Sequence, residues 1–564
     1  MRLIPTARGA YAALSGLLAA GLGLASALLV AAIVRPESSP LVTIGGTIID
    51  ATPTPVKEYA VRTVGTRDKP LLLLGIGIVL VILAMLAGML ASRRPLAGLC
   101  AMGLLGAVGV FAALTRPAAQ PFDVVPALVA GVVAVAALAY LRPRLPAPPA
   151  PAAPAPGPAP APGPGPQDPV WIRDSHVILG QDSGDFPDPN GIKDGAPAGD
   201  GAAGDGVKGG GVKGGGSRRG FLVAAGVVGG AAVVAGGAAG VIQRAKGGAA
   251  ARSRENLALP APKEPAGPRV TTPDFYTPAG KFYRVDTALT VPQIDVDRWR
   301  LTVHGLVDHP TTLDFGQLLD RGLIERDITL NCVSNEVGGP YIGTTRWLGV
   351  PVAGLLRAVG VRAGADQVVA RSVDGMTIGT PTEVLLDGRD GMLAVAMDGR
   401  PLPPEHGYPV RMLTPGLYGY AGSCKWVTEL ELSTFDAYDA YWVKRGWARR
   451  APVKTGSRID KPAPFATGLT AGPVTVAGVA WAQHRGVRAV EVQADDGPWM
   501  PAELLPVPST DTWVQWRLTW QARTGGHSLR VRATDTTGAV QPEKRQTPFP
   551  DGATGWHTLS VMVS

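Results

Sequence analysis

The stretch "SRRGFL" (217–222), followed by the run "VAAGVVGGAAVVAGGAAGVI" (223–242), divides the chain into two parts of different character. A serine and a paired arginine before phenylalanine, leucine and a mildly apolar segment are typical of a twin-arginine export signal. The alternative is an ordinary transmembrane helix with positive charges at its inner end. Such export signals normally stand at an N-terminus, so the preceding residues have to explain this position.

Four long apolar runs precede the paired arginine, at residues 11–34, 71–91, 96–114 and 124–141. Each run is close to the roughly 20 residues that cross a bilayer as a helix. They predict four transmembrane helices within residues 1–142. Basic residues on the inner side fix the orientation, with the N-terminus and the end of the fourth helix inside. These residues are Arg2, Arg8, Arg93, Arg94, Arg142 and Arg144. The outer loop, 36–70, carries mixed charge.

Composition excludes several classes of protein. The chain has 564 residues, 46% hydrophobic and 17% charged, which predicts several domains with membrane segments. The net charge of +8 arises without a basic block interleaved with aromatic residues, so we expect no nucleic-acid partner. Three cysteines with no CxxC or CxxCH motif argue against iron–sulfur clusters and covalent haem.

The apolar runs also limit what the membrane part does. They contain no histidine, which excludes bis-histidine haem ligation, and almost no ionisable residue, which disfavours a transporter or a signalling protein. We interpret them as an anchor or a surface for docking a partner.

A low-complexity segment, 143–217, follows the fourth run. It contains "APPAPAAPAPGPAPAPGPGP" (147–166) and "GVKGGGVKGGG" (206–216). This composition cannot bury enough apolar surface to fold, so we expect a disordered cytoplasmic linker. Residues 218–243 then form the twin-arginine motif and a fifth transmembrane helix, which places the remainder outside the cell membrane. Twin-arginine export typically carries folded proteins, often with a cofactor already bound, so we expect a cofactor in the C-terminal half.

Residues 270–460 have the pattern of an α+β domain. "WRLTVHGLV" (299–307) alternates as a strand does, "TLDFGQLLDRG" (312–322) has helical spacing, and "RDITLNCVSNE" (326–336) predicts a strand ending at Cys332. No G-x-G-x-x-G after a strand, G-x-S-x-G or H-E-x-x-H occurs, and no histidines are closely paired. Three interpretations of Cys332 remain: a buried thiol, a disulfide with Cys424, or a soft ligand to a metal held by an organic cofactor.

Three segments in this region resemble a known family: "TLNCVSNE" (329–336), "PLPPEHGYPVRMLTPGLYG" (401–419) and "CKWVTELEL" (424–432). They are similar to the molybdenum-cofactor domain of the sulfite oxidase family. The resemblance implies a molybdenum–molybdopterin cofactor and two-electron chemistry of the oxygen-atom-transfer type, with Cys332 as the ligand to molybdenum. It also implies cofactor contacts by Tyr283, Arg284, Ser372, Asp374, His406, Arg411, Ser423, Cys424 and Lys425. A guanidinium and a lysine suit an anionic cofactor phosphate.

The sequence also departs from that family. Sulfite oxidases have an Arg-Asn-His stretch before "VP", arginines soon after the cysteine, and a tyrosine beside the substrate. The corresponding residues here are 286–288, Glu336 with Val337, and Met376. An anionic substrate would lose its cationic pocket, so sulfite is not the expected substrate.

Residues 464–564 predict a β-sandwich, since "VRAVEVQADDGPWMPAEL" (487–504), "TWVQWRLTWQAR" (512–523) and "HSLRVRATDTTGAVQ" (527–541) alternate apolar and polar residues between turns. The region resembles the immunoglobulin-like domain that follows the molybdenum domain in the family and often mediates dimers. We expect Trp513, Trp516 and Trp520 to be packing residues.

Together these patterns predict a multi-pass cell-membrane protein with an extracytoplasmic molybdopterin-dependent oxidoreductase domain. Its partners would be the twin-arginine export machinery, a separate electron-transfer partner (a haem protein or the quinone pool) and a second copy through the C-terminal domain. The alternative is a catalytically silent binding or scaffold protein in which Cys332 and Cys424 form a disulfide.

Overall fold

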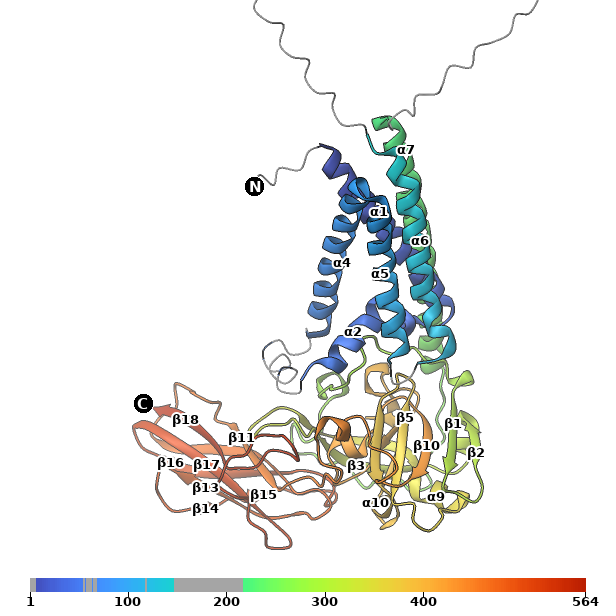
Figure 1. The fold of residues 1–564 in the computed structure, drawn as a ribbon. Coiled ribbons are helices and arrows are strands. Elements are labelled where there is room, and N and C mark those ends of the chain that lie inside the picture. Colours follow the sequence, from blue (N-terminus) through green and yellow to red (C-terminus); the bar gives the residue numbers. More distant parts are fainter. Residues whose placement is uncertain (1–6, 54–55, 57–62, 64–67, 117–118, 147–216) are drawn as a thin grey trace, which may run out of the picture.

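The computed structural model describes residues 7–53, 68–116, 119–146 and 217–564, together with Val56 and Thr63 (Figure 1). Arg2 and, apart from its two ends, the predicted linker 143–217 lie outside the described residues.

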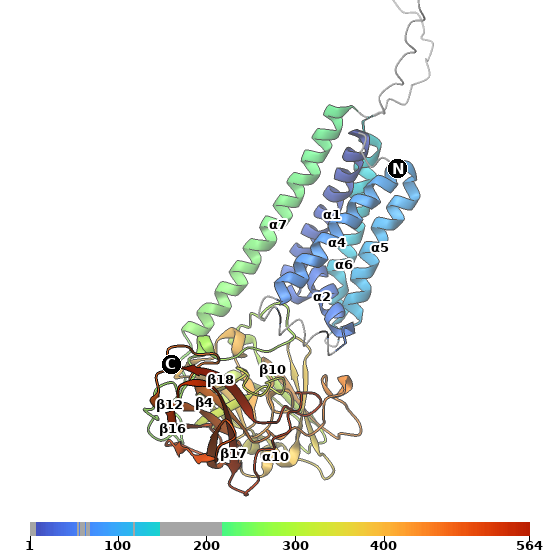
Figure 2. The same ribbon diagram turned by 90° about the vertical axis from the view of Figure 1, so that its left-hand side faces the viewer.

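Five long apolar helices stand together on one side of the molecule (Figures 1 and 2). They are α1 (Ala7–Ile33), α4 (Asp68–Arg93), α5 (Pro95–Leu114), α6 (Val125–Leu141) and α7 (Arg218–Glu255). By length and composition, each is sufficient to span a membrane. The first four coincide with the four apolar runs, and the fifth begins at the paired arginine.

Small residues allow these helices to pack closely. A Cβ atom on Gly16 of α1 would lie 2.0 Å from the carbonyl oxygen of Ala84 in α4, and one on Gly88 would lie 2.2 Å from that of Ala12. The two backbones therefore touch at glycine, a kind of contact that is common between helices in lipid.

Helix α7 is longer than the predicted 218–243 segment. Its start is capped by Ser217, whose Oγ accepts from the Gly220 amide at 3.0 Å. Beyond 243 the residues are mostly Ala, Arg, Lys and Glu, which favour continued helix, and the helix ends at Glu255. Near this end, the Ser253 hydroxyl lies 3.0 Å from the Tyr408 hydroxyl, so α7 runs from the helical bundle into contact with the central domain (Figure 2).

A short helix, α2 (Pro40–Ala51), lies within the loop 36–70. It begins with a proline at its first position, which is pre-organised for a helix start. The sequence analysis treated this segment only as an outer loop. In both ribbon views α2 lies at the end of the bundle nearest the central domain (Figures 1 and 2).

The central domain contains two sheets. The first has the order β2-β1-β10-β5-β6 and comprises β1 (Arg300–Gly305), β2 (Thr311–Asp314), β5 (Gln367–Ser372), β6 (Thr377–Pro381) and β10 (Val427–Ser433). The second has the order β3-β4-β7-β8, with β9 beside β7, and comprises β3 (Ile324–Asn331), β4 (Ile342–Pro351), β7 (Met392–Met397), β8 (Arg400–Pro401) and β9 (Arg411–Leu413). Only the β1–β10 pair is parallel among these strand pairs. The short helices are α8 (Phe315–Leu319), α9 (Val352–Val359), α10 (Thr382–Leu386) and α11 (Gly419–Gly422).

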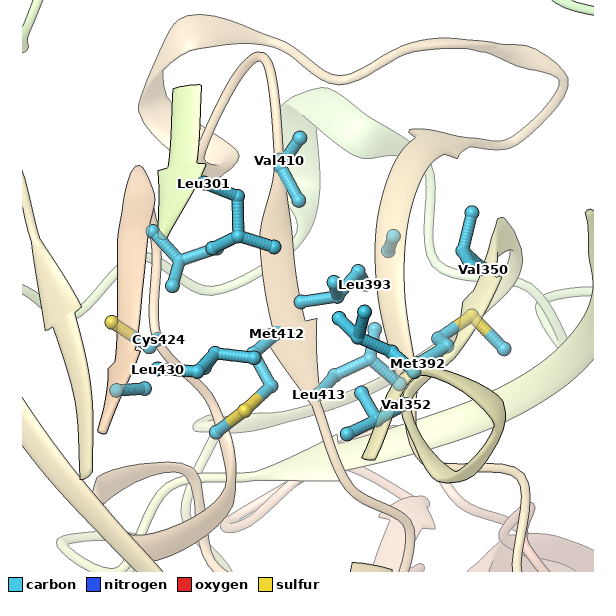
Figure 3. Packing of buried hydrophobic residues seen from close by; sticks show 14 of the residues in the cluster. Leu301, Val350, Val352, Met392, Leu393, Val410, Met412, Leu413, Cys424 and Leu430 are labelled. Carbon is cyan, nitrogen blue, oxygen red and sulfur yellow. The ribbon is translucent and has the colours of Figure 1, made fainter. Parts of the chain in front are cut away.

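One hydrophobic core joins the two sheets. Leu301 and Leu430 from the first sheet belong to the same buried cluster as Val350, Leu393 and Met412 from the second (Figure 3). Helix α8 is shorter than the helical spacing of 312–322 suggests, because residues 311–314 pair with β1 as strand β2. This antiparallel pairing overrides the local helical pattern.

The C-terminal region consists of two further four-stranded sheets, β11-β12-β16-β15 and β14-β13-β17-β18. Their strands are β11 (Gly456–Lys461), β12 (Gly472–Trp481), β13 (Val487–Ala494), β14 (Met500–Pro501), β15 (Glu503–Leu504), β16 (Val514–Ala522), β17 (Gly525–Asp535) and β18 (His557–Val563). The inward side chains of both sheets form one core, which includes Trp516 and Trp520. Trp513 instead fills the junction with the central domain, where its Nε1 donates to the carbonyl of Phe275 at 3.1 Å.

Charged contacts join the helical bundle to the central domain. Asp50 at the end of α2 accepts from the hydroxyl of Tyr441 at 2.5 Å and from Arg445 at 3.0 Å. Arg35 donates to the carbonyl of Val373 at 3.3 Å. These contacts seat the segment between α1 and α4 against the turn that follows β5 and against the segment that contains Tyr441 and Arg445.

Candidate active site

A cavity of about 200 Å³ lies in the central domain where several distant segments meet. Its walls come from residues 283–287, the end of β3, the turn after β5, and the segments on either side of α11. Eight of the ten predicted site residues line it: Tyr283, Cys332, Ser372, Asp374, Arg411, Ser423, Cys424 and Lys425.

Cys332 follows the last residue of β3, and its amide donates to the carbonyl of Tyr341 at 3.0 Å. Its Sγ lies 2.9 Å from the Ser334 hydroxyl. Burial raises the pKa of this thiol, and the contacts with Ser334 act in the opposite direction. Cys332 and Cys424 are both free, so the structure does not contain the disulfide of the alternative interpretation.

Arg411 is a buried cation at the start of β9, with an exposed fraction of 5%. Its guanidinium lies 5.4 Å from the centre of the Trp347 ring, and its Nε is buried without a hydrogen-bond partner. Burial lowers the pKa of Arg411, whereas the nearby Tyr283, Cys424 and Asp286 act to raise it. Within the described part of the chain, no carboxylate forms an ion pair with this residue.

Ser423 and Lys425 present further polar groups to the cavity. The Ser423 hydroxyl is buried without a partner. The Lys425 ammonium contacts Asp286 at 2.9 Å, and burial lowers the pKa of Lys425 to about 8 although Asp286 opposes the shift. Between them, Cys424 lines the cavity and also belongs to the hydrophobic cluster, at whose edge it lies in Figure 3, and burial raises the pKa of its thiol.

Ser372 is the last residue of β5, and Asp374 lies in the turn between β5 and β6. The Met376 amide donates to the Asp374 carboxylate at 3.2 Å, which holds the turn against the cavity. Met376 itself lines the cavity at the place where the sequence departs from the sulfite oxidase pattern.

Two predicted residues, His406 and Arg284, do not line the cavity. The His406 Nε2 lies 3.0 Å from the carbonyl of Ala279, and its Nδ1 is buried without a partner. Burial, together with Arg411 and Lys425, lowers the pKa of His406 to about 4. Arg284 donates to Asp286 at 3.0 Å. Neither residue therefore lines the cavity, and their contact with the cofactor stays a prediction.

Asp286 connects this site to the helical bundle. Its carboxylate contacts Lys425 and Arg284, and also Lys69 at the start of α4, whose Nζ lies 2.5 Å from Oδ1. Burial acts to raise the pKa of Asp286, but Lys425 and Lys69 together hold it well below its usual range. In the sequence Asp286 stands out only as a departure from a family pattern, and no local pattern singles out Lys69.

The side of the cavity nearest the C-terminal domain is aromatic. Tyr420, Trp442 and Trp447 line it, and Pro548 reaches it from the loop before β18. The Phe549 ring packs edge-on against Trp447 at 5.4 Å. The sequence analysis also missed these four lining residues, because none lies in the motifs that it used.

Comparison with known proteins assigns the class. Residues 288–442 match the family described as the oxidoreductase molybdopterin binding domain. An uncharacterized oxidoreductase, YuiH of Bacillus subtilis (strain 168), is 31% identical over 156 residues, which are 28% of this chain and 75% of that protein. Mitochondrial sulfite oxidase of Homo sapiens is 27% identical over 351 residues, and the match covers 53% of this chain and 63% of that protein.

One solved structure, the sulfane dehydrogenase SoxCD of Paracoccus pantotrophus, aligns at 24% identity with a TM-score of 0.45, over 52% of this chain and 85% of that chain. The family match, together with the cavity, defines an oxidoreductase with a buried, partly cationic cofactor pocket. The chain belongs to the molybdopterin-binding oxidoreductases of the sulfite oxidase family, and its cofactor is molybdenum–molybdopterin. These matches confirm the predicted enzyme class and cofactor.

The residues of the cavity fit such a group. Molybdopterin is polar and anionic. The cavity offers it the buried guanidinium of Arg411 and the buried hydroxyl of Ser423. The Arg411 Nε and the Ser423 Oγ have no hydrogen-bond partner in the described protein. A buried polar group without a partner costs about 1–3 kcal/mol, so these two groups are suited to a ligand. A free thiol on the same cavity supplies the soft donor that molybdenum accepts.

Proposed function

We propose that the protein is a membrane-anchored, extracytoplasmic oxidoreductase in which Cys332 ligates molybdenum. The observation that carries this proposal is the placement of the free Cys332 thiol, the unpartnered Arg411 Nε and the unpartnered Ser423 hydroxyl around one cavity. When bound, the cofactor supplies two-electron chemistry of the oxygen-atom-transfer type. Arg411, Ser423 and Lys425 would hold its anionic part, and Cys332 would hold the metal.

Positions behind the cavity would support this binding. His406 is neutral at neutral pH because its pKa lies near 4, so its unpartnered Nδ1 can accept or donate one hydrogen bond according to the tautomer. Arg284 and Asp286 orient Lys425. Tyr283, Ser372, Asp374 and Cys424 complete the wall.

The substrate would be a molecule that an aromatic rather than a cationic pocket accepts. Tyr420, Trp442 and Trp447 form one side of the cavity, and the nearby Asp286 carboxylate contacts three cations of this chain. Aromatic faces favour flat or apolar groups, whereas a small anion such as sulfite needs cationic contacts. This proposal agrees with the departures seen at 286–288, Glu336 and Met376.

We place the central and C-terminal domains outside the cytoplasm. Support comes from basic residues beside the apolar helices, such as Arg93 and Arg142, and from the twin-arginine pattern at Arg218 and Arg219. A cofactor assembled before export explains why a folded domain would follow this pattern.

The C-terminal sheets would form an immunoglobulin-like sandwich that mediates a homodimer. The domains would span 1–142, 143–217, 218–243, 270–460 and 464–564.

Electrons would pass to a separate partner, a haem protein or the quinone pool. The sequence has no haem, flavin or iron–sulfur motif, so this chain carries no second redox group of those kinds.

Elemental analysis of the purified full chain tests the metal site. Wild-type protein should contain molybdenum, Cys332→Ser should lose it while keeping its fold by circular dichroism, and Cys100→Ser, at the exposed thiol of α5, should retain it. Equal molybdenum content in Cys332→Ser and wild type would reject the assigned ligand.

The topology has its own test. Arg218→Lys with Arg219→Lys should leave the C-terminal half protected from protease added to intact spheroplasts, whereas wild type should be digested. Equal digestion of both forms would reject export through the twin-arginine route.

A further inference from the structure

We propose that the helical bundle holds one acyl chain of a membrane phospholipid in an apolar cavity beside the active-site domain. This inference goes beyond the proposed function, since it concerns the bundle and involves neither the metal nor the substrate. It rests on helices long enough to span a membrane, on the lining and the dimensions of the cavity, and on how the cavity is closed.

The lining of the cavity is apolar throughout. The cavity has a volume of about 560 Å³ and lies between α1, α2, α4, α5 and α6. The described residues that line it are all Ala, Gly, Ile, Leu, Met, Pro or Val. Such walls give water none of the polar partners that it needs, and an empty space of this size would destabilise the bundle in proportion to its volume. The cavity therefore requires an apolar occupant, which the bilayer around the helices supplies.

The dimensions of the cavity match a single hydrocarbon chain. Along α4 its wall runs from Leu73 to Ala84, a rise of about 16 Å. This is close to one leaflet, since the hydrocarbon core of a bilayer is about 30 Å thick. Spread over this length, a volume of about 560 Å³ gives a mean width of about 7 Å. A helix with its side chains is about 10–12 Å across, whereas carbon atoms in contact lie about 4 Å apart, so an acyl chain fits and a helix of a partner does not.

Contacts within this chain close both ends of the cavity. In the middle of the bundle, Ala84 is the last residue of α4 that lines the cavity, and at this point the backbones of α1 and α4 touch at Gly16. At the other end, α2 forms the floor. A Cβ on Gly45 of α2 would lie 2.7 Å from the Cδ1 of Leu289, so the central domain packs beneath this floor. The cavity therefore occupies the half of the bundle nearest the central domain.

The wall formed by α4 is the open side. Leu74, Ile78 and Ile82 line the cavity and yet have exposed fractions of 60%, 52% and 51%. A hydrocarbon chain can enter past these side chains from the adjacent leaflet while its headgroup stays at the membrane surface. No polar group then has to enter the bundle, where it would have no partner.

The acyl chain would also support the contact between the bundle and the active site. Lys69 lies about one turn before Leu73 on α4, and its Nζ contacts Asp286 and donates to the carbonyl of Ala288 at 2.7 Å. From Leu73 onwards α4 borders the cavity, so the occupant supplies the packing contacts that other helices do not supply there. A filled cavity therefore holds the start of α4, and with it Lys69, against Asp286.

Two glycines on opposite walls allow the cavity to be filled by substitution. Gly77 of α4 and Gly21 of α1 both line it, and a Cβ on either would meet no atom within 4 Å. Leucine at these positions therefore occupies the space without a clash at Cβ. Gly75 of α4 has equally free surroundings but does not line the cavity, so Gly75→Leu is the matched control. All three substitutions favour the helix, because leucine is a better helix former than glycine.

Photo-cross-linking of the full chain in phosphatidylcholine nanodiscs tests the site. The discs contain a phospholipid with a diazirine on its acyl chain, and peptide mass spectrometry locates the label. Leu105 of α5 lines the cavity, whereas its neighbour Leu104 does not and is 64% exposed. Wild type and Gly75→Leu should be labelled at both residues. In Gly77→Leu and Gly21→Leu the label at Leu105 should fall about tenfold or more relative to Leu104, since a filled pocket rejects its ligand.

The same ratio of label at Leu105 and Leu104 in all four forms would overturn this inference. Label at Leu104 without label at Leu105 in wild type would also overturn it, and this result decides the point even where a variant does not fold. A solvent extract of purified wild type that contains an isoprenoid quinone but no phospholipid would assign the cavity to a different occupant and reject the proposal.

Discussion

The buried guanidinium of Arg411 provides a test in which stability and cofactor binding change in opposite directions. Arg411→Met keeps most of the side-chain volume and removes the charge. In protein without cofactor, Arg411 has only Trp347 beneath it and no hydrogen bond to the described protein. We therefore expect the cofactor-free variant to be more stable than the wild type.

The magnitude follows from burial. Replacing buried ionic groups by apolar groups of similar volume is often neutral or stabilising by about 1–4 kcal/mol. The lost cation–π contact with Trp347 costs about 0.5–2 kcal/mol. The centres of the two ranges leave a net gain of about 1 kcal/mol, which raises Tm by roughly 2–4 °C for a domain of this size.

Cofactor binding should change the other way. A hydrogen bond from a charged group contributes about 1.5–3 kcal/mol. The molybdenum content of Arg411→Met should therefore be lower than that of the wild type by a factor of about ten or more. Arg411→Lys keeps the charge but loses the guanidinium geometry, and should fall between the two.

Thermal unfolding of cofactor-free protein and elemental analysis of protein as isolated measure the two effects. Arg357→Met, on the exposed face of α9, is the control and should alter neither. A lower Tm for cofactor-free Arg411→Met, with Arg357→Met unchanged, would refute the reasoning about buried charge. Unchanged molybdenum content would refute the assignment of Arg411 to the cofactor.

Three further predictions concern the junction, pH and the C-terminal domain. Lys69→Met and Asp286→Asn should show a coupling energy above about 0.5 kcal/mol in a double-mutant cycle of unfolding free energies, and additive effects would contradict their contact. Burial lowers the pKa of His406 from 6.5 to about 4 in the folded protein. As the pH falls from 6.5 to 4, the unfolded chain therefore binds a proton at this histidine before the folded protein does, and the free energy of unfolding decreases. His406→Asn should flatten this slope in denaturant titrations of cofactor-free protein, and an unchanged slope would exclude the residue. Gly478→Ala should destabilise the C-terminal domain by about 3 kcal/mol, because its Cβ would lie 1.9 Å from a backbone oxygen of β11. Gly526→Ala is the control, since its Cβ would meet only the end of a flexible methionine. Equal melting temperatures of the two variants would show that β11 moves to accept the extra methyl group.

The sequence by itself determined the parts whose signal is local. The apolar runs appear as helices α1, α4, α5, α6 and α7, because a bilayer-length apolar segment satisfies its backbone only as a helix. Cys332 follows a strand as its pattern predicted, and the three matching segments were sufficient to indicate the enzyme class and the cofactor. The paired arginine begins a helix, but its role in export stays a prediction.

Only the tertiary structure decided how the two halves meet. Lys69 contacts Asp286, and Asp50 contacts Tyr441, across hundreds of residues of sequence. Neither pair has a local signal, because a polar contact between distant segments depends on how whole domains pack. For the same reason Pro548 could not be foreseen at the active-site cavity, and Arg284 was expected in its wall, whereas packing places it behind. Local pattern thus determined the helices, the class and the cofactor, and packing determined that the helical bundle borders the site.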